Sequence, residues 1–235
     1  MGGTANRSRR GQRKKESSWQ AIYAQFARWS QDGSFQRAWQ QSIGTIQGQL
    51  DLTVLNLDGS HSLAKKGGES VAYQGRKKGK TSNILPIMDG NGYVVASTGI
   101  IAGNHNDAYQ LQTHLQAAFQ AMKRLGLAFA GAYFNADSAF DTKAARKTCF
   151  NYQVIPNIPP NPRSRKQVKR GRKPLFNAAV YHQRFCAERT FAWVDKFKRL
   201  LVRFERKDAL FFGAYCLAFA LINLRQVLAA ETDEC

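Results

Sequence analysis

The amino-acid sequence predicts an α/β fold, in which a mixed β-sheet is flanked by helices and preceded by a small helical region. Three observations lead to this prediction. Short apolar or alternating segments, typical of strands, occur between residues 49 and 158. Segments with apolar residues every three or four positions, typical of helices, separate the later strands and fill the C-terminal part. Apolar residues make up 43% of the 235 residues, enough for a substantial core.

The segment before the sheet is expected to contain two short helices. Residues 1–16 are polar and basic, so we expect a flexible tail and no signal peptide. A first helix capped by Ser17 or Ser18 is expected, because aromatic and apolar residues recur there at helical spacing: Trp19, Ile22, Tyr23, Phe26 and Trp29. Asp32-Gly33 is expected to end it, and a second helix to cover residues 35–43. These helices would form a small lobe held by aromatic packing.

The central part of the chain is expected to supply the first three strands. The stretch "QLDLTVLNLD" alternates and is rich in strand-forming residues, so it predicts a strand that ends at Asp58. Residues 59–82 are rich in Gly, Ser and Lys and predict a loop or an exposed hairpin. The apolar runs at 83–88 and 93–101 are joined by Asp89-Gly-Asn-Gly92, which is a strong hairpin signal.

Helices are expected to alternate with the later strands. Residues 103–126 predict a helix capped by Asn106 or Asp107 and ended by Gly126. A strand at 128–135, a helix at about 141–152 capped by Asp141, and a strand at 153–158 follow. One long helix is expected from about 176 to 207, and a last apolar helix from about 209 to 228. Its sixteen-residue apolar run, 209–224, is shorter than the ~20 residues that span a bilayer, so a buried helix is favoured.

The charge of the chain indicates a polyanionic partner. Thirty-five Lys and Arg residues against sixteen Asp and Glu give a net charge of +19. They cluster at 7–15, 65–80 and 163–173, which favours contact with nucleic acid phosphates over an ordinary solvated surface. The cysteines have no zinc-binding spacing and are expected to be reduced thiols. We expect contacts with the DNA backbone from Lys77, Lys78, Lys80, Arg165, Lys166, Lys169 and Arg170.

The order of the elements matches a ribonuclease H-like core. In that topology the first and fourth strands lie side by side and parallel, so Asp58 and Asp137 would converge at one edge of the sheet. Glu188 in the long helix can supply a third acid. Three carboxylates at one place repel unless cations lie between them, and Mg²⁺ suits such oxygen ligands. Each acid also has a simpler interpretation: a turn residue for the two aspartates, a solvated helix residue for Glu188.

Other residues of the long helix would share a face with Glu188. Tyr181, Arg184 and Asp195 follow helical spacing with it. Arg184, one turn before the acid, could grip a phosphate or steady the carboxylate. Tyr181 could contact DNA or pack in the core.

At this helix the sequence resembles a known family. The spacing Tyr181-x₂-Arg184-x₃-Glu188 is similar to that of bacterial insertion-sequence transposases with an Asp-Asp-Glu active site, and within these to the insertion sequence five group. Further similar stretches include "LDGSH", "AGNHND" and "NADSAFD", so the resemblance covers about residues 49–207. Residues 17–48 resemble the end of the helical DNA-binding region that precedes the catalytic core in such proteins.

The resemblance implies a metal-dependent DNA transposase of the bacterial cytoplasm, associated with the nucleoid. Asp58, Asp137 and Glu188 would bind two Mg²⁺ ions, which Mn²⁺ can replace. Water would attack at the element ends, and the freed 3′-hydroxyl would attack target DNA. Joining two ends implies a homodimer or a higher assembly on DNA, without a membrane partner. The implied domains are a basic tail (1–16), a partial helical DNA-binding region (17–48) and a catalytic domain (49–235).

Two departures from the family pattern leave alternatives open. The family has a Lys seven residues after the Glu, where this chain has Asp195. Lys196 lies ~80° further round the helix from Glu188 and is expected to reach DNA instead. The N-terminal helical region is also shorter than usual. The alternatives are therefore a truncated, non-catalytic DNA-binding remnant of a transposase, or a basic RNA-binding or ribosome-associated protein.

Overall fold

The central layer of the computed structural model, which describes residues 17–106, 108–161 and 175–233, is a five-stranded mixed sheet. Its strands lie in the order β6-β5-β1-β8-β9. β1 pairs with β8 and β8 with β9 in parallel, whereas β5 and β6 run antiparallel. The bounds are β1 Val54–Leu57, β5 Pro86–Met88, β6 Val94–Ser97, β8 Tyr133–Asn135 and β9 Ile155–Asn157. This arrangement confirms the ribonuclease H-like prediction, including the parallel first and fourth strands.

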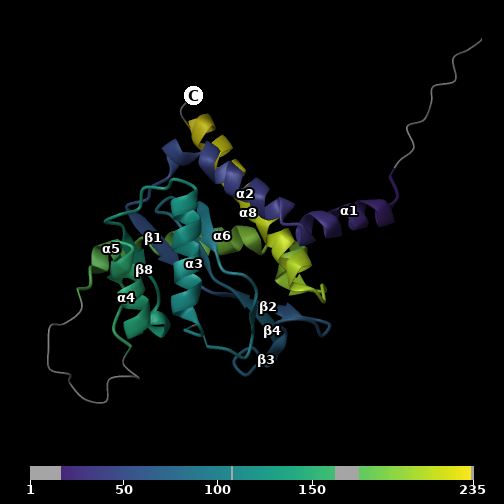
Figure 1. Ribbon diagram of the computed structural model, residues 1–235, viewed down its shortest axis with the longest axis horizontal. Helices are drawn as coiled ribbons and strands as arrows, with labels where there is room; N and C mark the ends of the chain where they lie inside the picture. The colour runs from purple at the N-terminus through teal and green to yellow at the C-terminus, as the bar shows by residue number, and fades with distance from the viewer. Residues whose placement is uncertain (1–16, 107, 162–174, 234–235) are drawn as a thin grey trace, which may run out of the picture.

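Helices cover this sheet and connect its parallel strands (Figure 1). α3 (Leu111–Arg124) packs against α4 (Lys143–Asn151), and these two helices also contact β6 and β9, respectively. α6 (Phe185–Val194) packs against β1 and against α8 (Asp208–Asp233), which in turn contacts β6. The core between helices and sheet is apolar and includes fully buried Leu55, Phe119, Phe134 and Phe219.

The two N-terminal helices form as expected and pack on the C-terminal helix. α1 (Trp19–Gln31) begins after Ser18, whose hydroxyl accepts a hydrogen bond of 3.3 Å from the backbone N–H of Ala21. α2 (Ser34–Thr45) lies along α8, and its Trp39 ring is 5.2 Å from the ring of Phe219. Figure 1 shows α1, α2 and α8 together on one side of the molecule. The expected aromatic packing is only partly present, because Trp19 is 72% exposed.

A second sheet extends the β1–β5 pair beyond the central sheet. Its strand order is β10-β2-β4-β3, and β7 also pairs with β4. Of the loop and the exposed hairpin expected for residues 59–82, the structure has paired strands, and these belong to a larger sheet whose other strands come from distant segments. The bounds are β2 Ser60–Ala64, β3 Ala72–Gln74, β4 Gly79–Ile84, β7 Ile101–Ala102 and β10 Val202–Arg203.

Two expected helix caps are wrong. α3 begins only at Leu111, after Gln110 in the left-handed conformation with φ 45°, so Asn106 does not cap it; Asp107 lies outside the described residues. Thr142, not Asp141, caps α4 by accepting a hydrogen bond of 3.1 Å from the N–H of Ala145. Asp141 forms an ion pair with Arg146 instead, at 2.8 Å.

The long helix expected at 176–207 is also wrong, because the segment is interrupted. It forms α5 (Ala178–His182), α6, and the single turn α7 (Lys198–Leu201), and then enters β10. Gln183 and Arg184 make up the α5–α6 joint. There the backbone changes to tighter bonds three residues apart, with the N–H of Arg184 bonded to the carbonyl of Tyr181 at 3.0 Å.

The last helix is longer than expected but lies where the sequence places it. α8 has 26 residues and contains the stretch Asp208–Arg225, whose mean hydropathy of 1.4 would by length and composition allow it to cross a membrane. Within the protein, 56% of that stretch is buried. This burial against α1, α2, α6 and β6 is that of a core helix.

Candidate active site

Asp58 directly follows β1 and is partly buried at the end of that strand. Its carboxylate accepts a hydrogen bond of 2.9 Å from the backbone N–H of Gly59. It also pairs with Arg184, whose Nη1 lies 2.7 Å from Oδ2. The pKa of Asp58 is raised above its ordinary value, mainly by burial and to a smaller extent by the charge of Asp137. The charge of Arg184 and the hydrogen bonds from Arg184 and Gly59 oppose this shift. A cation beside this carboxylate is therefore stabilising, and Arg184 supplies one.

Asp137 lies at the equivalent position beyond the neighbouring strand. The register of β1 and β8 pairs Asn56 with Asn135, and each aspartate follows its asparagine by two residues. The exposed Asp137 caps the short turn Ser138–Phe140 by accepting a hydrogen bond from the N–H of Ser138. The fold thus brings both aspartates to one edge, close enough for their charges to interact.

Arg184, at the α5–α6 joint, and Tyr181, on α5 just before it, face these aspartates. The guanidinium carbon of Arg184 is 5.7 Å from the ring centre of Tyr181. Burial lowers the pKa of Arg184, but Asp58, Tyr181 and Asp137 outweigh burial, so the net shift is upward. Burial raises the pKa of Tyr181, and Arg184 opposes this shift. The sequence leaves two roles open for Arg184, a phosphate contact or support of the Glu188 carboxylate; the carboxylate that it contacts in the structure is that of Asp58.

Glu188 stands apart from this cluster. It lies on the first turn of α6, one turn beyond Arg184, and is exposed. In the part of the chain that the structure describes, no three His, Cys, Asp or Glu side chains lie close enough to hold a metal ion. The carboxylates of Asp58, Asp137 and Glu188 therefore do not form one group here. Asp195, the C-cap of α6, keeps helical backbone angles and follows Glu188 by seven residues on one helix, whereas Tyr181 belongs to the separate helix α5.

The described lysines expected to contact DNA lie in two different places. Lys77 and Lys78 are exposed on the turn between β3 and β4, and Lys80 is exposed at the start of β4; we name these three lysines the basic turn. Lys196 follows α6, with its Nζ 3.7 Å from the ring centre of Trp193 in a shallow pocket between α6 and α8. The remaining four lie outside the described residues: Arg165, Lys166, Lys169 and Arg170.

Sequence reasoning missed a row of buried asparagines beneath the site. Asn56, Asn135 and Asn157, named here the asparagine row, lie in register on β1, β8 and β9 and are at most 1% exposed. Their side-chain amides bond to one another and to the segment of α5 and α6. The sequence does carry a signal, because Asn precedes each aspartate by two residues in "NLD" and "NAD".

Asp89 begins the turn between β5 and β6, as the sequence predicts, but its complete burial was not expected. Its carboxylate accepts backbone hydrogen bonds from Tyr93, at 2.7 Å, and from Asp51, at 2.8 Å. Burial raises the pKa of Asp89 to about 7, although the backbone N–H groups of Tyr93, Asp51 and Gly92 lower it. Asp89 therefore holds the hairpin that the sequence predicts, at an electrostatic cost.

We expect the contribution of Asp89 to the free energy of unfolding to decrease as the pH rises. The folded pKa of about 7 lies above the ordinary value of 3.8. The stabilising proton is therefore fully bound below pH ~4 and is lost as the pH rises through ~7. Asp89→Asn removes this titration, so its unfolding should depend less on pH in that window. Urea unfolding of both proteins at about pH 5, 6 and 8 measures the difference. If the free energy of unfolding changed equally with pH in the two proteins, the expectation would be contradicted.

Residues 49–224 match the family model described as "Transposase DDE domain". No curated protein matches the chain. Among solved structures, the chain is similar to "Mos1 transposase paired-end complex with left transposon end", with 12% identity, a TM-score of 0.37, and coverage of 92% of this chain and 67% of that one. For "Crystal structure of the Mos1 mariner paired end complex with Mn" the values are 13%, 0.34, 92% and 68%.

Proposed function

The chain belongs to the transposase DDE domain family, and we propose that it is a DNA transposase that cuts DNA at the ends of an insertion sequence and joins them to target DNA. The observation that carries this proposal is the parallel pairing of β1 and β8, which sets Asp58 and Asp137 at one edge of the sheet. We assign the chain to the insertion sequence five group on the motifs around Tyr181, Arg184 and Glu188.

We propose that Asp58 and Asp137, with Glu188 as third ligand, hold divalent metal ions: two Mg²⁺, which Mn²⁺ can replace. The two aspartates suit such ions, because their carboxylates are hard oxygen ligands whose mutual repulsion a cation relieves. Glu188 is one helical turn from Arg184 but does not lie in one group with Asp58 and Asp137. Its proposed role as a metal ligand therefore rests on the family pattern. When bound, such ions activate the attacking oxygen and stabilise the leaving oxygen.

The protein's own residues account for the rest of the mechanism. Arg184 neutralises part of the charge of Asp58 and lies where a phosphate would approach the two acids. Tyr181 lies next to it and limits the orientations that its guanidinium can take. Both side chains thus shape the approach of the scissile phosphate.

Arg184→Gln is expected to raise the pKa of Asp58 further. Arg184 opposes the effect of burial, so without it burial and Asp137 act alone on a carboxyl whose pKa is already raised. The acidic limb of the pH–rate profile should therefore move to higher pH. Carboxyl titration by NMR measures the pKa directly. Arg189→Gln is the control, because Arg189 lies on the same helix but bonds to the carbonyl of Asn91 at 2.8 Å. Equal pKa values of Asp58 in the two variants would refute the expectation.

We propose that DNA lies across the site and contacts the basic turn, Lys196, and the basic segment 163–173. Contacts of Lys and Arg with phosphates are largely independent of sequence and release counterions. Replacing Lys77, Lys78 and Lys80 with Gln should weaken binding to all DNA sequences alike. The slope of log affinity against log salt should become shallower by about 1 per lysine. A slope unchanged in the triple variant would place the basic turn away from DNA.

The remaining assignments follow from this function. Two element ends must be joined, so we propose a homodimer or higher assembly on DNA, in the bacterial cytoplasm at the nucleoid. We also propose that the chain consists of a basic tail (1–16), a partial helical DNA-binding region (17–48) and a catalytic domain (49–235). A non-catalytic remnant is not favoured, because the family match spans all three acids.

The function is tested with the DNA that flanks the gene. Purified protein is incubated with labelled end DNA and target DNA, with Mg²⁺, with Mn²⁺, or with a chelator. Metal-dependent nicks at the element ends followed by joined products support the proposal. Salt-sensitive binding of DNA without any cleavage would support the remnant instead.

A further inference from the structure

Three side-chain amides in the middle of a parallel sheet require an explanation. Parallel strands covered on both faces normally carry apolar residues, and a buried amide is costly unless its hydrogen bonds are made. In the asparagine row these bonds are made. The Nδ2 of Asn157 donates to the Oδ1 of Asn135 at 2.8 Å, and the Nδ2 of Asn135 donates to the Oδ1 of Asn56 at 2.9 Å. The row thus runs across β9, β8 and β1 without interruption.

The other hydrogen bonds of the asparagine row are made with the segment of α5 and α6 or with the turn between β5 and β6. Asn157 forms two bonds with the backbone of Asn177, which caps α5, at 2.8 and 2.9 Å. Asn135 donates to the carbonyl of Val180 at 2.9 Å. Asn56 donates to the Sγ of Cys186 on α6 at 3.2 Å and to the carbonyl of Asp89 at 3.3 Å. The helical segment is therefore attached to three strands in turn: Asn177 to β9, Val180 to β8 and Cys186 to β1.

The bond from Asn135 explains where the helix is interrupted. In a regular α-helix the carbonyl of Val180 would accept from the N–H of Arg184, four residues later. Here that N–H bonds to Tyr181, and Val180 accepts from Asn135 and, at 3.1 Å, from the N–H of Gln183. Asn135 thus replaces a helical donor at the α5–α6 joint, which places Arg184 over Asp58.

We propose that the asparagine row positions the α5–α6 joint, and with it Tyr181, Arg184 and Glu188, relative to the two catalytic aspartates. The inference rests on the proposed function for its catalytic part. Each aspartate follows an asparagine of the row by two residues, just beyond the end of the same strand. The row therefore fixes the helix against the same strands that carry the acids. Displacements of about 1 Å at an active site can cost 10²-fold in rate. These asparagines are positioning residues, since their amides are buried and do not face substrate.

Asn135→Leu tests the proposal, with Asn223→Leu as the matched control. Asn223 is also 1% exposed, and both of its amide atoms bond to the backbone of Val94, at 2.9 and 3.1 Å, where they attach α8 to β6. Single-turnover cleavage, DNA affinity and the free energy of unfolding are measured for both variants. We expect Asn135→Leu to lower the cleavage rate of folded protein about tenfold or more, with less than about a threefold change in DNA affinity. Asn223→Leu should lose stability only.

Amide hydrogen exchange provides a readout that does not depend on catalysis. Exchange at residues 183–187 should become faster in Asn135→Leu but not in Asn223→Leu. If the wild-type protein does not cut DNA, the proposed function fails, while the exchange still tests the row. Equal exchange at the joint in both variants, or equal losses of rate per folded molecule, would overturn the inference. If Asn135→Leu does not fold, Asn157→Ser weakens the same row at its outer end and should speed exchange at the start of α5.

Discussion

Replacing Asp137 with Asn is expected to lower the rate of DNA cleavage by a factor of about 10³ or more, with little change in folding. Asn keeps the shape of the side chain and can still accept the hydrogen bond from Ser138 that caps the following turn. Asp137 is exposed, so the substitution leaves no buried charge without a partner. What it removes is the negative charge next to Asp58, which the proposed metal site requires.

Asp141→Asn is the matched control for this prediction, because both acids belong to the stretch "NADSAFD". Asp141 is largely buried, pairs with Arg146 at 2.8 Å, and accepts a hydrogen bond of 2.9 Å from the N–H of Asn161. Its loss should reduce the free energy of unfolding but leave the cleavage rate per folded molecule nearly unchanged. Cleavage kinetics and urea unfolding of both variants separate the two effects. Comparable rates in the two variants would remove Asp137 from the active site.

The parts of the fold that sequence predicted correctly depend on local signals. The turn Asp89-Gly-Asn-Gly92 between two apolar runs specifies the β5–β6 hairpin, and Gly126, with φ +72°, ends the segment of α3. The parallel pairing of β1 and β8 then follows from the few topologies that connect such elements without crossing. For the same reason both aspartates could be found before the structure was known.

The parts that sequence reasoning missed depend on contacts between distant residues. β10 is only two residues long, and it is a strand because it pairs with β2. The paired residues of β2 lie more than a hundred positions earlier in the sequence. The pattern of 176–207 is helical throughout, but the carbonyl of Val180 bonds to Asn135, and this tertiary bond interrupts the helix. The Arg184–Asp58 ion pair likewise joins residues 126 positions apart. Local periodicity contains no information on such partners.

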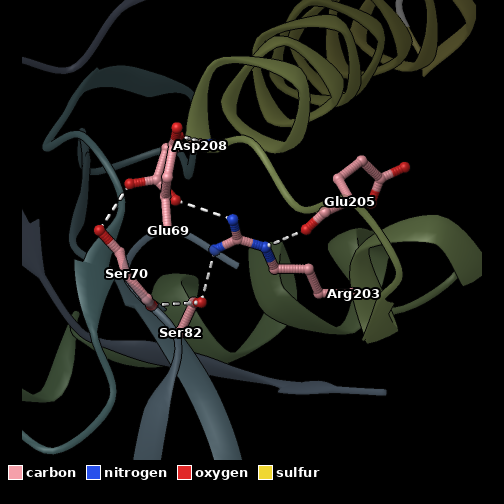
Figure 2. A network of polar contacts seen from close by, with 6 residues as sticks. All are labelled: Glu69, Ser70, Ser82, Arg203, Glu205 and Asp208. Atoms are coloured by element: carbon pink, nitrogen blue, oxygen red, sulfur yellow. Dashed lines mark hydrogen bonds and ion pairs between the residues drawn. The ribbon is translucent and has the colours of Figure 1, made fainter. Parts of the chain in front are cut away.

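Arg203→Met is expected to lower the free energy of unfolding by about 3 kcal/mol or more, because it breaks a buried ionic network by removing one partner. Arg203 on β10 is fully buried. Its guanidinium donates to Ser82 at 2.6 Å, to Asp208 at 2.8 Å, and to the carbonyl of Glu205 at 2.8 Å. Figure 2 shows these bonds and the further link from Asp208 to Ser70. Met fills a similar volume but satisfies none of these groups.

Arg37→Met is the control for this change. Arg37 is 62% exposed and lies 3.9 Å from Asp32, so its loss should cost no more than about 1 kcal/mol. Urea unfolding measures both variants, and similar losses would show that the Arg203 network contributes little to stability.

Arg203→Met should also affect DNA binding, because the hydrogen bonds of Arg203 join the second sheet to α8. Arg203 lies on β10, Ser82 on β4, and Asp208 is the first residue of α8. β4 begins at Gly79 and includes Lys80, so the position of the basic turn depends on how firmly this sheet is held. We therefore expect the folded fraction of Arg203→Met to bind DNA more weakly and with a shallower salt dependence, although the substituted residue is itself too deeply buried to touch DNA. Unchanged salt dependence would mean that β2 and β4 hold the basic turn through their pairing with one another, without help from α8.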